Sequence, residues 1–337
     1  MSVSPQAHDA NTGVVTAPSV TLATFNYEHG GFSRHTGGYS LEPAADHVAA
    51  CVPDLDLLLF QEGNHYQRDG GRAAFRFAEL LHERLGGSWG THLAVNTVNP
   101  HHNLVYYRTG RFRVIEAWSR RDDPDFRAAN EGTVWLRVDG IARPLIVGSV
   151  HWRSVSGPMR AEQARALCTL IPHLAIIGGD MNCLWPGAME RRPPWHELPP
   201  HLAGSKTLID PGTGALSADL QAGSIALRHG WVDAGALAED YSETTNLARD
   251  PAPCRIDRIM VSPGLGATLD TPTYRVHQDP RPADPISDHR VVSVRLHLAE
   301  YGRPFHAPWW DESSFGGWTY AGAEYPRALG GWVRRSR

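Results

Sequence analysis

Reactive polar side chains follow several apolar, strand-like runs in this sequence. The run LAIIGGDMN reaches Asp180 and Asn182, the run LIVGSVH ends in His151, and the run TLATFN ends in Asn26. Asn26, Asp180 and Asn182 could belong to ordinary turns, because Gly, Asp and Asn are common turn residues. His151 could be a hydrogen-bonded histidine in or beside the core. The repetition of such groups at successive strand ends favours a shared polar site at one edge of a β-sheet.

Further carboxylates and a histidine continue this pattern. Glu62 follows the run LLLFQ, and Asp288 and His289 come just before the run VVSVRL. Asp257 lies inside the apolar run RIDRIMV, where a lone carboxylate is costly unless it is paired or hydrogen-bonded. Asp257 could pair with Arg255 or Arg258, but alternation along a strand places Arg258 on the opposite face. Strands of mixed direction would bring all of these groups to one edge.

The elements that position these groups are short strands alternating with amphipathic segments. Strands are predicted where Val, Ile, Leu and aromatic residues gather between turn residues, over residues 20–26, 54–61, 91–96, 103–108, 133–138, 144–151, 174–180, 255–262 and 291–298. Helices are predicted over residues 43–52, 70–85, 158–171 and 217–229. The mixed connections favour a sheet with both parallel and antiparallel neighbours.

Three further segments flank or interrupt the expected domain, residues 19–302. Residues 1–18 are small and polar and are predicted to be disordered. Residues 186–213 hold many prolines and little periodicity, which predicts a long surface loop. The tail, residues 303–337, is rich in aromatic residues and glycine, and we expect it to pack on the domain or on a partner.

The polar motifs, taken in order, resemble those of the endonuclease/exonuclease/phosphatase superfamily, the metal-dependent phosphoesterases related to pancreatic deoxyribonuclease, abasic-site endonucleases and sphingomyelinases. The matching elements are TFN, FQE, SVHW, GGDMN, RIDRIMV and SDHRVV, and they span residues 22–296. Each motif alone is weak, but the ordered set is specific. The resemblance implies an α/β fold, a four-layered sandwich in which two mixed β-sheets pack face to face and helices flank them.

The resemblance also implies a divalent metal. Glu62 would be its principal ligand, with Asn26 beside it and Asp288 nearby. Carboxylate and amide oxygens suit a hard cation. The expected cofactor is therefore Mg²⁺ or Mn²⁺.

Catalytic roles follow from the same resemblance. Asp180 would orient or deprotonate the attacking water, and Asn182 would hold the phosphoryl oxygen or the nucleophile. His289 would contact the phosphate while Asp257 holds its other ring nitrogen. His151 would polarise the phosphate or protonate the leaving group.

Composition limits the kind of protein and its surroundings. The formal net charge of the 337 residues is -4, which excludes binding to a polyanion through a global positive field. The four cysteines form no C-x-x-C pair, and the reducing cytosol is the predicted location. No apolar run approaches the roughly 18 residues of a membrane helix, so no membrane insertion is expected.

Substrate alternatives remain open at this point. A nuclease acting on DNA or RNA is favoured by a local arginine run, whose members are Arg108, Arg111, Arg113, Arg120 and Arg121. Such a run is also typical of a solvated hairpin. A phosphatase or phosphodiesterase for a small molecule or lipid headgroup would use the proline-rich loop and the tail as pocket walls. A non-catalytic binding protein on the same fold is the remaining alternative.

Overall fold

The structure is a computed structural model that describes residues 18–96, 99–119, 131–138, 141, 143–246, 248, 250–266, 268–298, 318–320 and 332–334. The chain divides into one unit at Met1–Tyr301 and another at Gly302–Arg337. In the second unit, the antiparallel strands β15 (Trp318–Tyr320) and β16 (Trp332–Arg334) are described. The predicted disorder of residues 1–18 falls almost entirely outside the described residues, as does the predicted packing of the tail.

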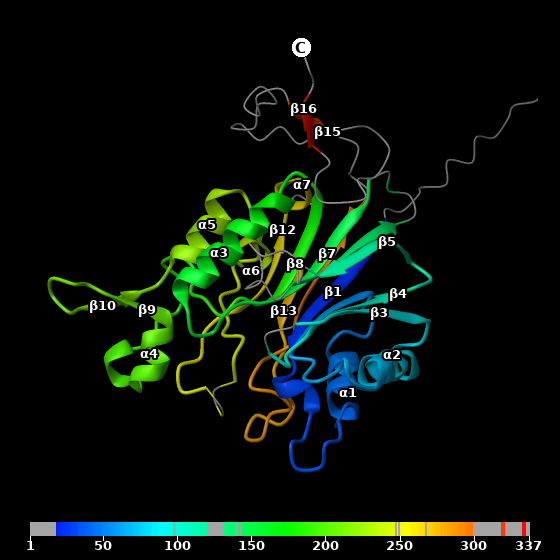
Figure 1. Cartoon of the computed structure of the whole chain (residues 1–337), viewed down its shortest axis with the longest axis horizontal. Coiled ribbons are helices and arrows are strands. Elements are labelled where there is room, and N and C mark those ends of the chain that lie inside the picture. Colours follow the sequence, from blue (N-terminus) through cyan, green and yellow to red (C-terminus); the bar gives the residue numbers. More distant parts are fainter. Residues whose placement is uncertain are drawn as a thin grey trace, which may run out of the picture. The chain divides into compact units, whose positions relative to one another are not determined.

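The first of two large sheets is six-stranded and mixed (Figure 1). Its central strands β1 and β2 are parallel, whereas β14 and β4 run antiparallel to them. In spatial order the strands are β13 (Leu269–Val276), β14 (Val292–His297), β1 (Ser19–Asn26), β2 (Leu57–Gln61), β4 (Asn103–Arg108) and β3 (Trp89–Ala94).

The second large sheet is also six-stranded and mixed. Strands β7 and β8 are parallel, and β12 runs antiparallel to β8. In spatial order the strands are β11 (Val232–Asp233), β12 (Asp257–Val261), β8 (Leu174–Asp180), β7 (Leu145–His151), β6 (Glu131–Val138) and β5 (Phe112–Ser119).

The hydrophobic core lies between these sheets. Leu22 and Leu59 of the first sheet share one buried cluster with Val147 and Ile176 of the second. Because side chains alternate along a strand, the intervening residues face outward, and Phe60 packs in a separate cluster with the helices. The predicted face-to-face pair of mixed sheets is therefore confirmed.

Helices flank the sheets on both sides (Figure 1). On the first sheet, α1 (Glu42–Cys51) and α2 (Arg72–Leu85) bury apolar stripes against the outer face. On the other side of the molecule, α3 (Gly157–Leu167) packs against α5 (Gln221–Arg228). Helix α3 begins where the Ser156 hydroxyl accepts a hydrogen bond from the Met159 N–H, with Pro158 in the first turn.

Short elements complete the described part of the domain. Helix α6 (Ala234–Leu237) begins at Asp233, whose carboxylate caps its first N–H groups. Helix α7 (Pro263–Gly266) follows β12 directly.

The predicted loop over residues 186–213 is wrong in its second half. Helix α4 (Pro200–Lys206) lies there, because a proline is well suited to the first turn of a helix. It leads directly into β9 (Thr207–Ile209), which pairs with β10 (Leu216–Ala218). The helix predicted from residue 217 consequently begins later, as α5 at Gln221.

Strands β5 and β13 were not predicted. Both are edge strands of their sheets, and their ladders are irregular, with register shifts between Val114 and Glu116 and between Asp270 and Arg275. Strand β13 also contains Pro272, which a strand tolerates at an edge. Half-solvated, charged edge strands lack the continuous apolar run that identified the central strands.

Buried hydrogen bonds join the two large sheets near the ends of β2 and β7. The Gln61 amide donates to Ser149 Oγ at 2.9 Å, and that hydroxyl donates to the Phe60 carbonyl at 3.0 Å. Gln61 and Ser149 are fully buried and belong to different sheets. An unsatisfied buried polar group is costly, so this link constrains how the sheets meet.

Ser149→Ala is expected to lower the free energy of unfolding by about 1–3 kcal/mol, because it leaves the Gln61 amide buried without its acceptor. Chemical denaturation measures the change, and Ser154→Ala, at an exposed position, is the matched control. Equal stability of the two variants would show that the link contributes nothing.

Candidate active site

The predicted polar groups meet at one edge of the inter-sheet core. On β8, Leu174 and Ile176 face the core, and Asp180 occupies a later position of the same stripe. Asp180 is paired in register with His151 of the parallel strand β7 and with Asp257 of the antiparallel strand β12. The mixed strand directions thus bring three reactive groups side by side, as the sequence predicted.

Asp180 lies at the centre of the site. Its side chain is almost fully buried. It accepts hydrogen bonds from the Asn182 backbone N–H at 2.8 Å, from Asn182 Nδ2 at 3.0 Å and from Asn26 Nδ2 at 3.2 Å. His151 Nε2 and His289 Nε2 lie 3.5 Å and 3.7 Å from its Oδ2 atom. This carboxylate is therefore oriented from several sides.

Burial raises the pKa of Asp180, and the nearby Asp257 carboxylate raises it further, whereas the charges of His289 and His151 oppose the shift. A carboxylate with a raised pKa is a stronger base than an exposed one. The position suits proton abstraction from a water molecule.

The glycines before Asp180 permit the close packing of β8 at this edge. A Cβ atom on Gly179 would lie 1.9 Å from the Val150 carbonyl oxygen, and the residue has a φ of +150°. A Cβ atom on Gly178 would lie 2.6 Å from a methyl group of Leu59 in the facing sheet. The dipeptide therefore allows the reactive end of the strand to fit against its neighbours.

His289 is held by Asp257 from behind. Its Nδ1 atom lies 2.8 Å from Asp257 Oδ2, which leaves Nε2 directed toward Asp180. Burial lowers the pKa of His289, but the Asp257, Asp180 and Asp288 carboxylates outweigh burial and raise the pKa well above its ordinary value. His289 is thus stabilised as an imidazolium, a form that can donate a hydrogen bond to an anionic oxygen.

The loop that carries His289 is fixed by residues that sequence analysis did not single out. Asn246 donates its side-chain amide to the Ser287 carbonyl at 2.7 Å and its backbone N–H to the Asp288 carbonyl at 2.7 Å. The Ser287 hydroxyl donates to the Asn26 carbonyl at 2.7 Å. Asn246 lies in an irregular segment, so no periodic pattern indicated its role.

Glu62 adopts an unusual backbone conformation just beyond β2, with a φ of 60°. Its carboxylate accepts hydrogen bonds from Asn26 Nδ2 at 3.2 Å and from the His29 backbone N–H at 3.0 Å. His101 Nδ1 lies 3.2 Å from Oε2, and His151 Nε2 lies 3.8 Å from Oε1. Burial raises the pKa of Glu62, but these donors and positive charges together hold the pKa well below its usual range.

The donor atoms around Glu62 fit a divalent cation. Asn26 is fully buried, and within the described part of the chain its Oδ1 atom has no hydrogen-bond partner. An oxygen in that position beside an ionised carboxylate is available as a ligand. The third predicted ligand, Asp288, contacts Ser287 at 3.3 Å and His289 at 3.9 Å. The structure thus places Asn26 with Glu62, and Asp288 beside Ser287 and His289.

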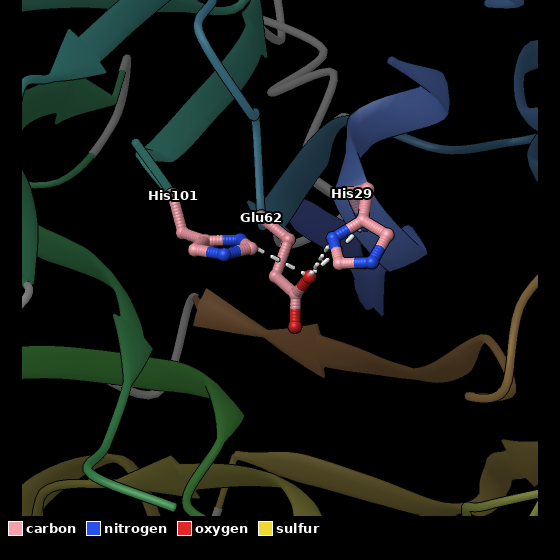
Figure 2. A group of neighbouring side chains, drawn as sticks. All are labelled: His29, Glu62 and His101. Atoms are coloured by element: carbon pink, nitrogen blue, oxygen red, sulfur yellow. Dashed lines mark hydrogen bonds and ion pairs between the residues drawn. The ribbon is translucent and has the colours of Figure 1, made fainter. Parts of the chain in front are cut away.

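Sequence analysis missed His29 and His101, which flank Glu62 (Figure 2). His29 lies in a one-turn 3-10 helix, Glu28–Gly31, and His101 lies in a loop, so both are outside the strand runs. A spacing that brings them to Glu62 is not visible along the chain.

Two members of the arginine run, Arg108 and Arg111, lie away from this site. Arg108 is the last residue of β4, and its neighbour Tyr107 pairs with Leu57 at the start of β2. Glu62 follows Gln61 at the other end of β2. Arg108 Nε donates to the Leu55 carbonyl at 2.6 Å, and Arg111 pairs with Asp56 at 2.6 Å. Arg120 and Arg121 lie outside the described residues. Arg108 and Arg111 therefore hold the opposite end of the sheet together.

Solved structures share this arrangement of sheets and helices. An endonuclease/exonuclease/phosphatase from Bacteroides vulgatus is similar with a TM-score of 0.56 at 16% identity, over 83% of this chain and 99% of that one. An endonuclease/exonuclease/phosphatase family protein from Bacteroides thetaiotaomicron is similar with a TM-score of 0.54 at 18% identity, over 83% of this chain and 98% of that one. Truncated Caenorhabditis elegans TDP2 gives 0.52 at 14% identity, over 83% and 97%.

The predicted resemblance is confirmed at the level of the fold: the chain has the α/β sandwich of the endonuclease/exonuclease/phosphatase superfamily. No family model matches the sequence. No curated protein matches it either. Within the described part of the chain, every helix is too short or too polar to cross a membrane.

Proposed function

We propose that this protein is a divalent-metal-dependent phosphoesterase that hydrolyses phosphodiester bonds, with nuclease activity the first to test. The observation that carries the proposal is that several groups converge on the Asp180 carboxylate. His151 Nε2 and His289 Nε2 lie within 4 Å of it. Glu62 is linked to it through the Asn26 amide, which donates to both carboxylates. A base, hydrogen-bond donors and a cation site then surround one point at the sheet edge.

The residues divide the reaction among them. Asp180 accepts a proton from the attacking water, and Asn182 holds that water or the phosphoryl oxygen. The imidazolium of His289, kept charged by Asp257, binds a phosphoryl oxygen as negative charge grows there. His151 donates a proton to the leaving oxygen as the phosphorus–oxygen bond breaks, so that an alcohol departs and a phosphate group remains.

The metal completes this chemistry. A divalent cation supplies Lewis-acid neutralisation of the phosphoryl oxygens. Glu62 and Asn26 Oδ1 would hold it, with Asp288 as a further candidate ligand. Mg²⁺ and Mn²⁺ are the cations that such oxygen donors suit.

The substrate class has two candidates. A DNA or RNA substrate is supported by fold likeness to D. rerio TDP2, whose structure was solved with a single-strand DNA product, at a TM-score of 0.50 and 14% identity. A small-molecule or lipid-headgroup phosphoester is favoured by a separate observation, since Arg108 and Arg111 are engaged within the protein, away from the site.

A metal-dependent substrate screen tests the proposal. Plasmid DNA, single-stranded RNA, bis(p-nitrophenyl) phosphate and a panel of phosphomonoesters are compared with and without EDTA. We expect phosphodiester hydrolysis that EDTA abolishes and that Mg²⁺ or Mn²⁺ restores. Glu62→Gln is expected to need more metal for half-maximal rate, whereas Glu162→Gln, whose side chain is 71% exposed, serves as the matched control.

Full activity in metal-free buffer would refute the metal-dependent reaction. Faster turnover of a phosphomonoester than of any polynucleotide, with a rate insensitive to salt, would replace the nuclease by the small-ester enzyme, because polyanion binding releases counterions and weakens as salt rises.

A further inference from the structure

His29 and His101 place imidazole nitrogens on either side of the Glu62 carboxylate (Figure 2). Their Nδ1 atoms lie 3.8 Å and 3.2 Å from Glu62 Oε2. One potential ligand atom from each of the three residues lies within 4.8 Å of the others. This separation is small enough for a single ion to contact all three.

The turn that carries His29 is locked against the segment that carries Glu62. Gly30, with a φ of +59°, allows this approach, since a Cβ atom there would lie 2.7 Å from the Glu62 carbonyl oxygen and 2.8 Å from the Asn64 nitrogen. The Tyr66 hydroxyl donates to the Gly30 carbonyl at 2.9 Å. His29 is therefore held at a set place relative to Glu62.

The loop that carries His101 is fixed to the same segment. The Gly63 N–H donates to the His102 carbonyl at 2.8 Å, and the His65 N–H donates to the Pro100 carbonyl at 2.9 Å. These backbone hydrogen bonds bracket His101 on both sides. Both histidines are thus preorganised by backbone contacts around Glu62, as a ligand site requires.

Two residues of this cluster have strained backbone conformations. His29 and Glu62 have φ values of 55° and 60°, in the left-handed region that side chains other than glycine rarely adopt. Such conformations persist where the surroundings hold them, and they gather at ligand clamps and active sites.

The chemistry of the donors selects the ion. Carboxylate and amide oxygens alone favour Mg²⁺, whereas imidazole favours first-row transition ions, which also bind mixed donor sites more tightly by their intrinsic order of affinity. Asn26 is fully buried beside Glu62, and its Oδ1 atom, which has no hydrogen-bond partner among the described residues, contributes an oxygen donor alongside the two imidazoles.

The geometry points to a mixed nitrogen–oxygen site in which His29 and His101 join Glu62 as ligands of a first-row transition ion such as Co²⁺ or Zn²⁺, bound more tightly than Mg²⁺. This inference rests on the proposed function, because Glu62 is a ligand in the mixed-donor site and in the metal site of the proposed reaction. The rival interpretation is that the histidines are only hydrogen-bonding partners of Glu62 or of the substrate. In that case their removal leaves metal selectivity unchanged.

Metal titration of the full chain, stripped of metal by chelation, tests the inference without any assay of activity. Co²⁺ and Mg²⁺ dissociation constants are measured by calorimetry, and the visible absorption of bound Co²⁺ reports nitrogen ligation. The variants are His29→Ala, His101→Ala and the corresponding glutamines, which keep a hydrogen bond to Glu62 but offer no imidazole. His196→Ala, at a side chain that is 81% exposed, is the control.

We expect each variant to weaken Co²⁺ binding by about 10- to 100-fold or more, at least the effect of losing an outer-shell partner, with little change for Mg²⁺. The Co²⁺ spectrum should shift as well. Co²⁺ affinity within about twofold of the wild type, or an equal loss for Co²⁺ and Mg²⁺, would overturn the inference. If Glu62→Gln abolishes binding of both ions while the histidine variants bind Co²⁺ as tightly as the wild type does, the inference falls and the proposed function stands. Failure of the wild type to bind any divalent ion would instead remove the metal from the proposed function itself.

Discussion

Replacing Asp180 with asparagine is expected to lower the turnover number by about 10²- to 10³-fold, because the amide cannot accept the proton of the attacking water. Asparagine nearly matches the shape of aspartate. Burial raises the pKa of Asp180, which means that its charged form is disfavoured in the folded protein, so removing the charge lifts a penalty on folding near neutral pH. The new NH₂ group faces an N–H donor, because both carboxylate oxygens of Asp180 accept hydrogen bonds, and this costs about 1–3 kcal/mol. The two effects oppose each other, so the variant should remain folded.

Steady-state kinetics and chemical denaturation together check this result. Asp210→Asn, at an exposed carboxylate of the β9–β10 hairpin, is the matched control and should retain full activity. Near wild-type turnover of Asp180→Asn would remove Asp180 from the role of base. A loss of turnover accompanied by unfolding would make its role structural.

Gly179→Ala is expected to lower the free energy of unfolding by about 3 kcal/mol or more and to abolish activity. The new Cβ atom would meet the Val150 carbonyl oxygen at 1.9 Å, a backbone atom that cannot move without separating β7 from β8. The φ of +150° adds strain for any side chain. Because Asp180 follows directly, a shift of the strand displaces the reactive carboxylate as well.

Thermal or chemical unfolding measures the loss of stability, and Gly204→Ala is the control. Gly204 lies in helix α4 with nothing within 4 Å of an added Cβ atom, so alanine should preserve or raise stability there. A Gly179→Ala protein as stable as the wild type would show that the strands relax freely at this edge. Asp180 would then owe its position to its own hydrogen bonds.

The central strands and most of the site could be predicted from sequence because both follow local periodicity. On β1, β7 and β8 an apolar stripe of alternate residues continues into Asn26, His151 and Asp180, and alternation carries these side chains to the same face as the stripe. The two-residue period depends only on neighbouring residues. It was therefore readable without knowing which strands are adjacent.

Edge elements were harder to predict for a related reason. Strand β13 is half solvated, interrupted by Pro272 and bulged, so its side chains carry no clean apolar pattern. The arginines of the run from Arg108 to Arg121 illustrate the same limit. Charge and spacing indicated a polyanion surface, but the structure pairs Arg111 with Asp56 and directs Arg108 to the Leu55 carbonyl.

Sequence alone determined the strands of a mixed sheet and the reactive groups at their ends, since both follow short-range patterns of apolar and polar residues. The face-to-face packing of two sheets was implied only by the resemblance of the ordered motifs to a known family. Tertiary structure alone decided which segments surround Glu62. His29 and His101 are 33 and 39 positions away from it along the chain, outside the strand runs, and they reach it through backbone hydrogen bonds and the close approach that Gly30 allows. Loop positions depend on contacts between distant segments, and no local period records such contacts.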